Sequence, residues 1–172
     1  MDSQGNEVDN PKFLRQSEKK LRRYQQTLSR KRKGSANRKK ALAKVQKLHE
    51  HIANQRRDFL HKQANRLAKT YAVICIEDLN IRGMKRNRKL AKSIHDVGWG
   101  MFKQFLKYKT LRDGGLLVLV KPHYTTINCS GCSNPVRKTL SVRTHVCPKC
   151  GLVLDRDHNA AINIENAGLA LL

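Results

Sequence analysis

Four of the five cysteines in this chain fall into two pairs that have the spacing of a zinc site. They lie in the segments CSGC and CPKC, as Cys129, Cys132, Cys147 and Cys150. Two intervening residues let both sulfurs of a pair turn toward one metal ion, and a second pair completes a tetrahedron. Four thiolates leave no position open for water, and they favour zinc over harder cations. We therefore predict a structural zinc ribbon over residues 123–154, with disulfides or an iron–sulfur site as the alternatives.

Three carboxylates near this ribbon could bind a harder cation. Glu77 directly follows the apolar run VICI, so we place it at the carboxyl end of a buried strand, where ligands and metals gather in open sheets. Asp155 has the position of an N-cap for a final helix, which would leave Asp157 free to point at the sheet. If Glu77 and Asp157 converge, they would give Mg²⁺ two ligands of a phosphodiester-cleaving site. The alternative is that both are structural, as acidic residues after strands and at helix starts usually are.

The charge of the chain indicates a nucleic-acid partner. Lys and Arg number 36 against 13 acidic residues, a formal net charge of +23, which a polyanion would neutralise. The excess is concentrated in residues 11–70, on helix-forming sequence, and this is the electrostatic footprint of a nucleic-acid-binding protein; a merely solvated surface is the alternative. The side chains that we expect to contact DNA or RNA are Arg30, Lys31, Arg32, Lys33, Arg38, Lys39, Lys40, Arg137, Lys138 and Arg143.

Two helices are predicted to carry this charge, as a basic helical hairpin over residues 12–70. After Pro11, apolar residues recur at helical intervals until Gly34 and Ser35 interrupt the pattern. The first helix would bury Leu14, Leu21, Tyr24 and Leu28; the second would present a narrow seam of Leu42, Val45, His49, Ile52, Arg56 and Phe59. A short turn favours antiparallel packing. Because two polar side chains interrupt the seam, the hairpin is expected to need a partner.

The rest of the chain predicts part of an α/β sheet over residues 71–122. The apolar runs at 73–76 and 116–120 are typical of strands buried on both faces, and a helix between them ends at Gly114 and Gly115. Cys75, within the first run, is interpreted as a core residue. Residues 1–11 are expected to be a disordered start, and 155–172 a last helix whose inward residues are Ala160, Ala161, Ile164 and Leu169.

The N-terminus does not have the pattern of a secretory signal. It reads MDSQGNEVDN, which is polar and acidic, and no apolar run approaches the roughly 18 residues of a membrane span. We therefore expect a cytoplasmic protein without a membrane partner. In a reducing compartment, paired cysteines are metal ligands more often than disulfides.

Several motifs, taken in order, resemble the C-terminal half of TnpB (OrfB) insertion-sequence proteins. They are LSRKRKGSANRKKA, DFLHK, ICIEDLNIRGM, a helix with W-x2-F, CSGC…CPKCG and LDRDHNAAINI, and the likeness runs from about Val8 to the C-terminus. TnpB proteins are transposase-type proteins related to type V CRISPR effectors. The resemblance implies a RuvC-like, ribonuclease-H-type domain that cuts DNA under the guidance of a transposon-derived RNA. It also implies a zinc ribbon inserted in that domain and a Mg²⁺-binding carboxylate triad.

Carried over residue by residue, the Glu of the triad falls on Glu77 and its last Asp on Asp157 rather than Asp155. The first catalytic Asp of the family lies on a strand upstream of the basic hairpin, and here only about ten polar residues precede that hairpin. Asp2 and Asp9 lie in no strand-like context and cannot replace it. We therefore expect an N-terminally truncated member with a partial RuvC-like domain and poor Mg²⁺ binding. It would have little or no nuclease activity alone and would be associated with the nucleoid of a prokaryotic cell. The alternatives are a non-catalytic competitor for nucleic acid and one half of a split nuclease.

Overall fold

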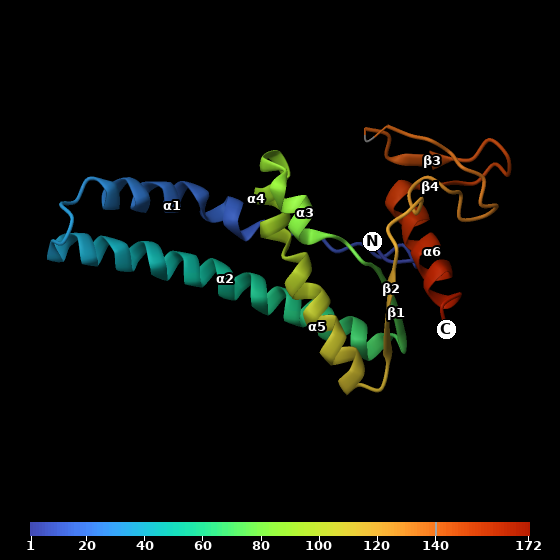
Figure 1. Cartoon of the computed structure of the whole chain (residues 1–172), viewed down its shortest axis with the longest axis horizontal. Helices are drawn as coiled ribbons and strands as arrows, with labels where there is room; N and C mark the ends of the chain where they lie inside the picture. The colour runs from blue at the N-terminus through green and yellow to red at the C-terminus, as the bar shows by residue number, and fades with distance from the viewer. Residues whose placement is uncertain (140) are drawn as a thin grey trace. The chain divides into compact units, whose positions relative to one another are not determined.

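The computed structural model describes residues 1–139 and 141–172, and side chains for all of these except 88–90 and 95. It has a mixed α/β fold, as predicted (Figure 1). The elements follow in the order α1 (Phe13–Ser29), α2 (Ala36–Thr70), β1 (Val73–Glu77), α3 (Ile81–Arg86), α4 (Arg88–Val97), α5 (Trp99–Arg112), β2 (Leu116–Val120), β3 (Thr144–Val146), β4 (Val153–Asp155) and α6 (Arg156–Leu169). Among the described residues, no helix combines the length and the apolar character needed to cross a membrane.

The chain forms two compact units, which are described separately. The hairpin unit consists of Asn10–Arg66 and Ile81–Leu106, and the sheet unit consists of Met1–Asp9, Leu67–Asn80 and Lys107–Leu172.

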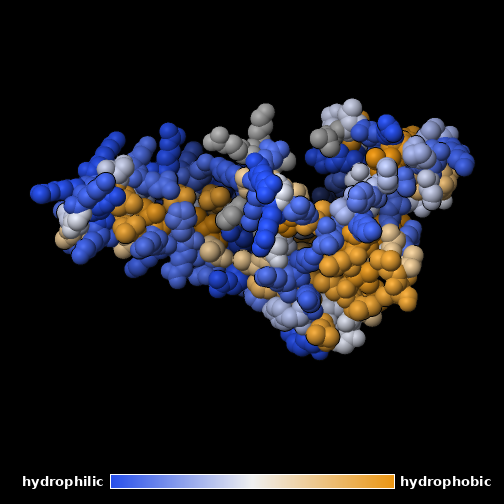
Figure 2. Space-filling model, viewed as in Figure 1, coloured by the Kyte–Doolittle hydropathy of each residue, from blue (hydrophilic) through white to orange (hydrophobic). Residues whose placement is uncertain are grey.

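In the hairpin unit, α1 and α2 pack along an apolar strip. The buried side chains of Leu21, Val45, Leu48 and Ile52 form the core of the strip. Figure 2 shows hydrophilic residues over both helices and hydrophobic residues between them. The two helices therefore pack on each other, with the basic side chains on the outer faces.

The seam predicted on α2 is wrong at two positions. Leu42 and His49 are exposed, and Ala41 and Leu48 are buried in their place. Steps of four, three and four residues from Ala41 through Val45 and Leu48 remain on one face, whereas each neighbouring residue is turned by about 100° around the helix. The prediction placed Leu42 in the seam because it is more apolar than Ala41. Only Ala41, the smaller residue, lies on the packed face.

A buried ion pair, which the sequence pattern did not predict, holds the hairpin unit together. Arg56 is 8 % exposed and Asp96, from α4, is 5 % exposed. The Arg56 Nε donates to the backbone oxygen of Asp96 at 3.0 Å, and its Nη2 lies 3.4 Å from Asp96 Oδ1. The same Oδ1 accepts from the backbone N–H of Leu14 at 3.2 Å, which satisfies a free donor at the start of α1. Asp96 therefore connects both helices of the hairpin.

In the sheet unit, β1 and β2 pair in parallel, from Val73 beside Leu116 to Glu77 beside Val120. The strands were expected to be buried on both faces, but Leu116 is 47 % exposed. Cys75, which was interpreted as core, is half-buried. Its Sγ faces Gly168 of α6 so closely that a Cβ on that glycine would lie 2.3 Å from the sulfur. Glycine at this position lets α6 pack against β1.

The last helix begins and packs largely as predicted. Ala160 is buried, Ala161 and Ile164 are half-buried, and Leu169 is 49 % exposed, so the expectation for Leu169 is wrong. One turn along the same face from Ile164 lies Gly168, which is buried. Gly168 fits closely against Cys75 of β1, and the next residue, Leu169, is exposed.

The first nine residues belong to the sheet unit and contain no helix or strand. Their contacts are polar: the hydroxyl of Tyr71 donates to Gln4 Oε1 at 3.0 Å, and the backbone oxygen of Ser3 lies 3.0 Å from His158 Nε2. The segment therefore contacts the beginning of α6.

Candidate functional site

The four cysteines predicted to bind zinc lie together. Their Sγ atoms are all within 4.8 Å of one another, and the shortest separations are 3.6 Å for Cys129 with Cys150 and 3.6 Å for Cys132 with Cys147. A tetrahedron with metal–sulfur bonds of about 2.3 Å has sulfur–sulfur edges of about 3.8 Å. No disulfide joins these residues, which are all free thiols. The four sulfurs therefore fit a single tetrahedral metal ion.

A similar turn brings together the two cysteines of each pair. In the first, Ser133 N–H donates to the Cys129 backbone oxygen at 2.8 Å; in the second, Gly151 N–H donates to the Cys147 oxygen at 3.0 Å. The residue after the second cysteine has positive φ in both turns, 58° at Ser133 and 75° at Gly151. The second turn connects β3 to β4, which pair in antiparallel fashion. Glycine adopts this backbone conformation without the strain that Ser133 accepts.

The proton affinities of two sulfurs are shifted in opposite directions. The backbone N–H of Cys150 stabilises the thiolate of Cys147 and lowers the pKa of Cys147 to about 6. The N–H of Leu152 lowers the pKa of Cys150, but the hydrogen bond shared with Cys132, together with burial, raises it to about 12. A metal ion bound here would have to displace the protons of the thiols, and the raised pKa of Cys150 makes its proton the hardest to displace of these two.

A polar pair lies inside the ribbon. His145 is fully buried, and its Nδ1 accepts from the Lys138 ammonium at 2.6 Å; Lys138 also donates to the oxygen of Val136 at 3.3 Å. Burial lowers the pKa of His145, and the neighbouring ammonium lowers it further. Burial is also the main reason why the pKa of Lys138 is lowered. Lys138, predicted to contact nucleic acid, is thus directed into the ribbon in this structure.

Two asparagines of α6 hold the loop that leads into the first cysteine pair. Asn159 is fully buried; its Nδ2 donates to the Asn128 oxygen at 2.8 Å, and its Oδ1 accepts from Ser130 N–H at 2.9 Å. Asn163 Nδ2 donates to the same Asn128 oxygen at 2.7 Å and to the Thr125 oxygen at 2.9 Å. Neither residue was predicted from the sequence. Their four-residue spacing, which places them on one face of the predicted helix, was the available signal.

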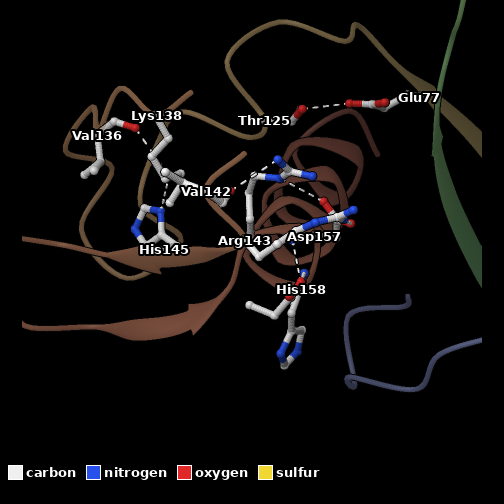
Figure 3. A network of polar contacts seen from close by, with 11 residues as sticks. Glu77, Thr125, Val136, Lys138, Val142, Arg143, His145, Asp157 and His158 are labelled. Atoms are coloured by element: carbon white, nitrogen blue, oxygen red, sulfur yellow. Dashed lines mark hydrogen bonds and ion pairs between the residues drawn. The ribbon is translucent and has the colours of Figure 1, made fainter. Parts of the chain in front are cut away.

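The loop also reaches the first predicted carboxylate. The hydroxyl of Thr125 donates to Glu77 Oε1 at 2.7 Å, as Figure 3 shows. Glu77 is the last residue of β1 and not the residue after it, so it lies at the carboxyl end of the strand, where it was predicted. A continuous set of hydrogen bonds therefore connects Glu77, through Thr125 and Asn163, to the loop that precedes Cys129.

The two aspartates at the start of α6 have different partners. Asp155 Oδ1 accepts from the N–H groups of Asp157 and His158 at 2.7 and 3.3 Å, which confirms Asp155 as the N-cap. Asp157 is half-exposed and makes ion pairs instead: its Oδ1 lies 3.1 Å from Arg156 Nε and its Oδ2 lies 3.6 Å from Arg143 Nη1 (Figure 3). Glu77 therefore contacts a neutral hydroxyl group, whereas Asp157 contacts two cationic guanidinium groups.

The predicted nucleic-acid-binding residues gather mainly at the turn of the hairpin. Arg38 is half-buried there and donates to the oxygens of Leu28 and Lys31 at 3.0 and 3.2 Å, which holds the turn together. Arg137 and Arg143 lie in the sheet unit and are exposed. The exposed basic side chains of the turn are those of Arg30, Lys31, Arg32, Lys33, Lys39 and Lys40.

Two family models match the chain. The OrfB_IS605 model, described as "Probable transposase", matches residues 1–88, and the model of the Cas12f1-like TNB domain matches residues 99–164. The second match spans the four cysteines and α6 as far as Ile164. Together the two matches cover parts of both units of the structure.

Curated relatives match nearly the whole chain. A "Putative RNA-guided DNA endonuclease" of Streptomyces pristinaespiralis is 42 % identical over 170 residues, which are 98 % of this chain and 42 % of that protein. "Putative RNA-guided DNA endonuclease InsQ" of Escherichia coli K12 is 37 % identical, over 92 % of this chain and 44 % of that protein. The chain therefore spans less than half the length of these relatives.

Solved structures support the same fold. A Cas12f1 chain from a complex with sgRNA and target DNA superimposes with a TM-score of 0.63 at 20 % identity, over 89 % of this chain and 41 % of that one. A CRISPR-Cas12f ternary complex has a chain with a TM-score of 0.63 at 21 % identity.

With one family model covering half of its residues, the chain belongs to the OrfB_IS605 transposase family, the family of TnpB-type, RNA-guided endonuclease-like proteins.

Proposed function

We propose that this chain binds nucleic acid and carries two carboxylates of a metal-dependent DNA-cleaving centre. In this proposal, residues 71–122 and 155–172 belong to a RuvC-like core, residues 12–70 are a basic hairpin that contacts DNA or a guide RNA, and residues 123–154 are a zinc ribbon. One observation supports the proposal most directly: the hydrogen bonds that connect Glu77, at the end of β1, to the cysteine loop and to α6, where Asp157 lies. These segments are distant in sequence.

Zinc is the metal proposed for the four thiolates. The sulfur–sulfur distances match a zinc tetrahedron, and four thiolates select zinc over Mg²⁺ or Ca²⁺. Because the ligand set is closed, the ion would order the ribbon and take no part in bond cleavage. The purified, reduced protein should contain one zinc per chain by elemental analysis. Chelation should unfold the ribbon and leave the hairpin helical by circular dichroism; a zinc content near zero would contradict the assignment.

The carboxylates are proposed to bind Mg²⁺ or Mn²⁺, which would stabilise charge on the phosphate during cleavage. Glu77 is half-buried and accepts a hydrogen bond from Thr125, which would fix its orientation toward a metal. Asp157 has ion pairs with two arginines in the structure. A metal ion at this carboxylate would have to displace Arg143, whose contact is the longer and more exposed of the two.

A non-catalytic binding role is the second candidate, and the ion pairs of Asp157 favour it. Arg143 and Arg156 neutralise the carboxylate without a metal ion. Two carboxylates also supply fewer oxygen ligands than a two-metal centre uses. We therefore expect the 172-residue polypeptide, when assayed alone, to bind nucleic acid without cutting it.

A cleavage assay separates the two roles. Supercoiled plasmid and labelled duplex, each with and without a candidate guide RNA, are incubated with the zinc-loaded chain and Mg²⁺ or Mn²⁺. Robust cutting that is lost in Glu77→Gln and in Asp157→Asn would refute the non-catalytic role and support the nuclease centre. Binding without cutting would support the non-catalytic role. Cutting that persists in both variants would indicate a contaminating nuclease.

A further inference from the structure

A groove between α1 and α2 has the composition of a site for an unpaired nucleotide. Its two parts have volumes of about 430 and 330 Å³, and Tyr24 and Lys44 line both of them. The first part extends toward the hairpin turn at Lys31, and the second extends along α2 to His51. Both parts are open to solvent, meet at the shared residues Tyr24 and Lys44, and lie within a single unit.

The walls of the groove are positively charged. The lining residues include Arg23 and five lysines and no carboxylate. Three of these lysines, Lys40, Lys44 and Lys47, follow one another along α2. With a rise of about 1.5 Å per residue, they are spaced by about 6 and about 4.5 Å along the helix axis. Such a row of ammonium groups can follow a single phosphodiester backbone from one phosphate to the next.

The Tyr24 ring borders both parts of the groove. It is half-buried and packs against the core strip formed by Leu21 and the apolar residues of α2. The Lys20 Nζ lies 5.9 Å and the Arg23 Cζ 5.7 Å from the ring centroid. These distances are at the outer limit of a cation–π contact, so the two cations can move to phosphates without a large loss. The ring would then be left between positive charges, ready to stack on a base.

We propose that this groove binds a single-stranded segment of nucleic acid, with one unpaired base stacked on Tyr24 and its flanking phosphates on the α2 lysines. The inference rests on the proposed nucleic-acid binding and adds the kind of strand that is recognised. In a duplex the faces of the bases are covered by their neighbours, so an aromatic ring in a concave site cannot stack on them. Single strands, in contrast, are commonly bound by aromatic stacking in a basic groove.

The main experiment measures the binding of the full chain to 12-nucleotide RNA and DNA strands of one sequence and to the matching duplex. We expect Tyr24→Leu to weaken single-strand binding roughly tenfold, within the range known for base–aromatic stacking, and to change duplex binding less than twofold. Tyr24→Phe keeps the ring and should bind as the wild type does. Tyr108→Leu is the matched control, since Tyr108 is also a helical tyrosine with a lysine nitrogen 5.5 Å from its ring. The RNA and DNA arms show which strand is preferred.

Two further measurements do not depend on the folding of a Tyr24 variant. A strand with one 5-iodouracil, irradiated on the wild-type protein, should cross-link to the peptide that contains Tyr24. Replacing both Lys40 and Lys44 with Gln removes two exposed charges. For single strands, the slope of log K against log[salt] should then become less steep by about 1.4, which is about 0.7 for each lost phosphate contact.

The outcomes distinguish this inference from the proposed function. If single strands bind tightly but cross-link elsewhere, and Tyr24→Leu has no effect, the groove is not the site, although nucleic-acid binding stands. If no nucleic acid binds at low-micromolar protein in 150 mM salt, the proposed function fails. Equal losses for single strand and duplex in a folded Tyr24→Leu protein would also overturn the inference, because the ring would then have no selective contact with an unpaired base.

Discussion

Replacing Asn159 tests whether α6 positions the metal-binding loop. The side chain is fully buried and makes one hydrogen bond as donor, to Asn128, and one as acceptor, from Ser130. In Asn159→Ala the Asn128 oxygen keeps its bond from Asn163, but Ser130 N–H loses its partner in this structure. Ser130 is half-buried, so the loss of this bond should cost about 1 kcal/mol, the lower end of the range for an unsatisfied donor. The cavity left by the amide group adds to this, for an expected loss of about 2–3 kcal/mol.

This loss should be measurable as metal affinity. Folding of the loop and metal binding are coupled, so free energy lost from the folded loop is lost from binding. A loss of about 2–3 kcal/mol corresponds to zinc affinity weaker by a factor of about 30 to 150. Competition with a chromogenic chelator measures this directly. Asn159→Asp should also weaken binding, because its carboxylate can accept from Ser130 but cannot donate to Asn128.

Asn166→Ala is the matched control, since Asn166 lies on the same helix with its side chain exposed. Its zinc affinity should equal that of the wild type. Equal affinities for Asn159→Ala and Asn166→Ala would show that the cysteine loop holds its shape without α6. The positional role argued for Asn159 would then be wrong, even if the variant were less stable to heat.

Three other variants test packing and backbone contacts. Gly168→Ala should destabilise the protein by about 1–3 kcal/mol in denaturant unfolding, since its Cβ would lie 2.3 Å from the Cys75 Sγ, and adding Cys75→Ala should recover part of the loss. No loss in Gly168→Ala would mean that α6 can move away from β1 at little cost. Ser133→Gly should stabilise the zinc-loaded protein by about 0.5–1 kcal/mol, seen as a small rise in melting temperature, because Ser133 has φ of 58°. A lower melting temperature would indicate that the Ser133 hydroxyl contributes more than the backbone strain costs. Arg56→Met should lower the free energy of unfolding by about 3 kcal/mol, because it leaves the Asp96 carboxylate buried without its cation. The double variant with Asp96→Asn should lose less stability than Arg56→Met alone. Equal losses in the two proteins would exclude the buried charge as the cause.

The parts of the fold that could be predicted from sequence depend on residues close together in the chain. The two turns of the metal site are each built within a C-x2-C segment, and the Asp155 cap needs only the next three residues. The break at Gly34 and the strand that ends at Glu77 are likewise encoded locally. In each case, hydrogen bonds within a few residues determine the backbone, so composition and spacing are sufficient.

The burial of individual side chains could not be predicted in this way. Leu42 and Leu169 are more apolar than Ala41 and Gly168, yet only the smaller residue of each pair is buried. Close packing of a helix on its neighbour favours small side chains where the backbones approach, and that approach is set by the neighbour. A hydrophobicity pattern contains no information on this distance.

The sequence by itself was enough to indicate a four-thiolate metal site, a basic hairpin and the family, because each depends on residue types in a characteristic order. The partners of the polar side chains depended on the folded chain. Arg56 meets Asp96 across 40 positions, and Asn163 meets Thr125 across 38, in contacts that no local spacing predicts. Buried polar groups must find partners wherever the chain brings them. The tertiary fold therefore determined how Glu77, the cysteine loop and α6 are connected.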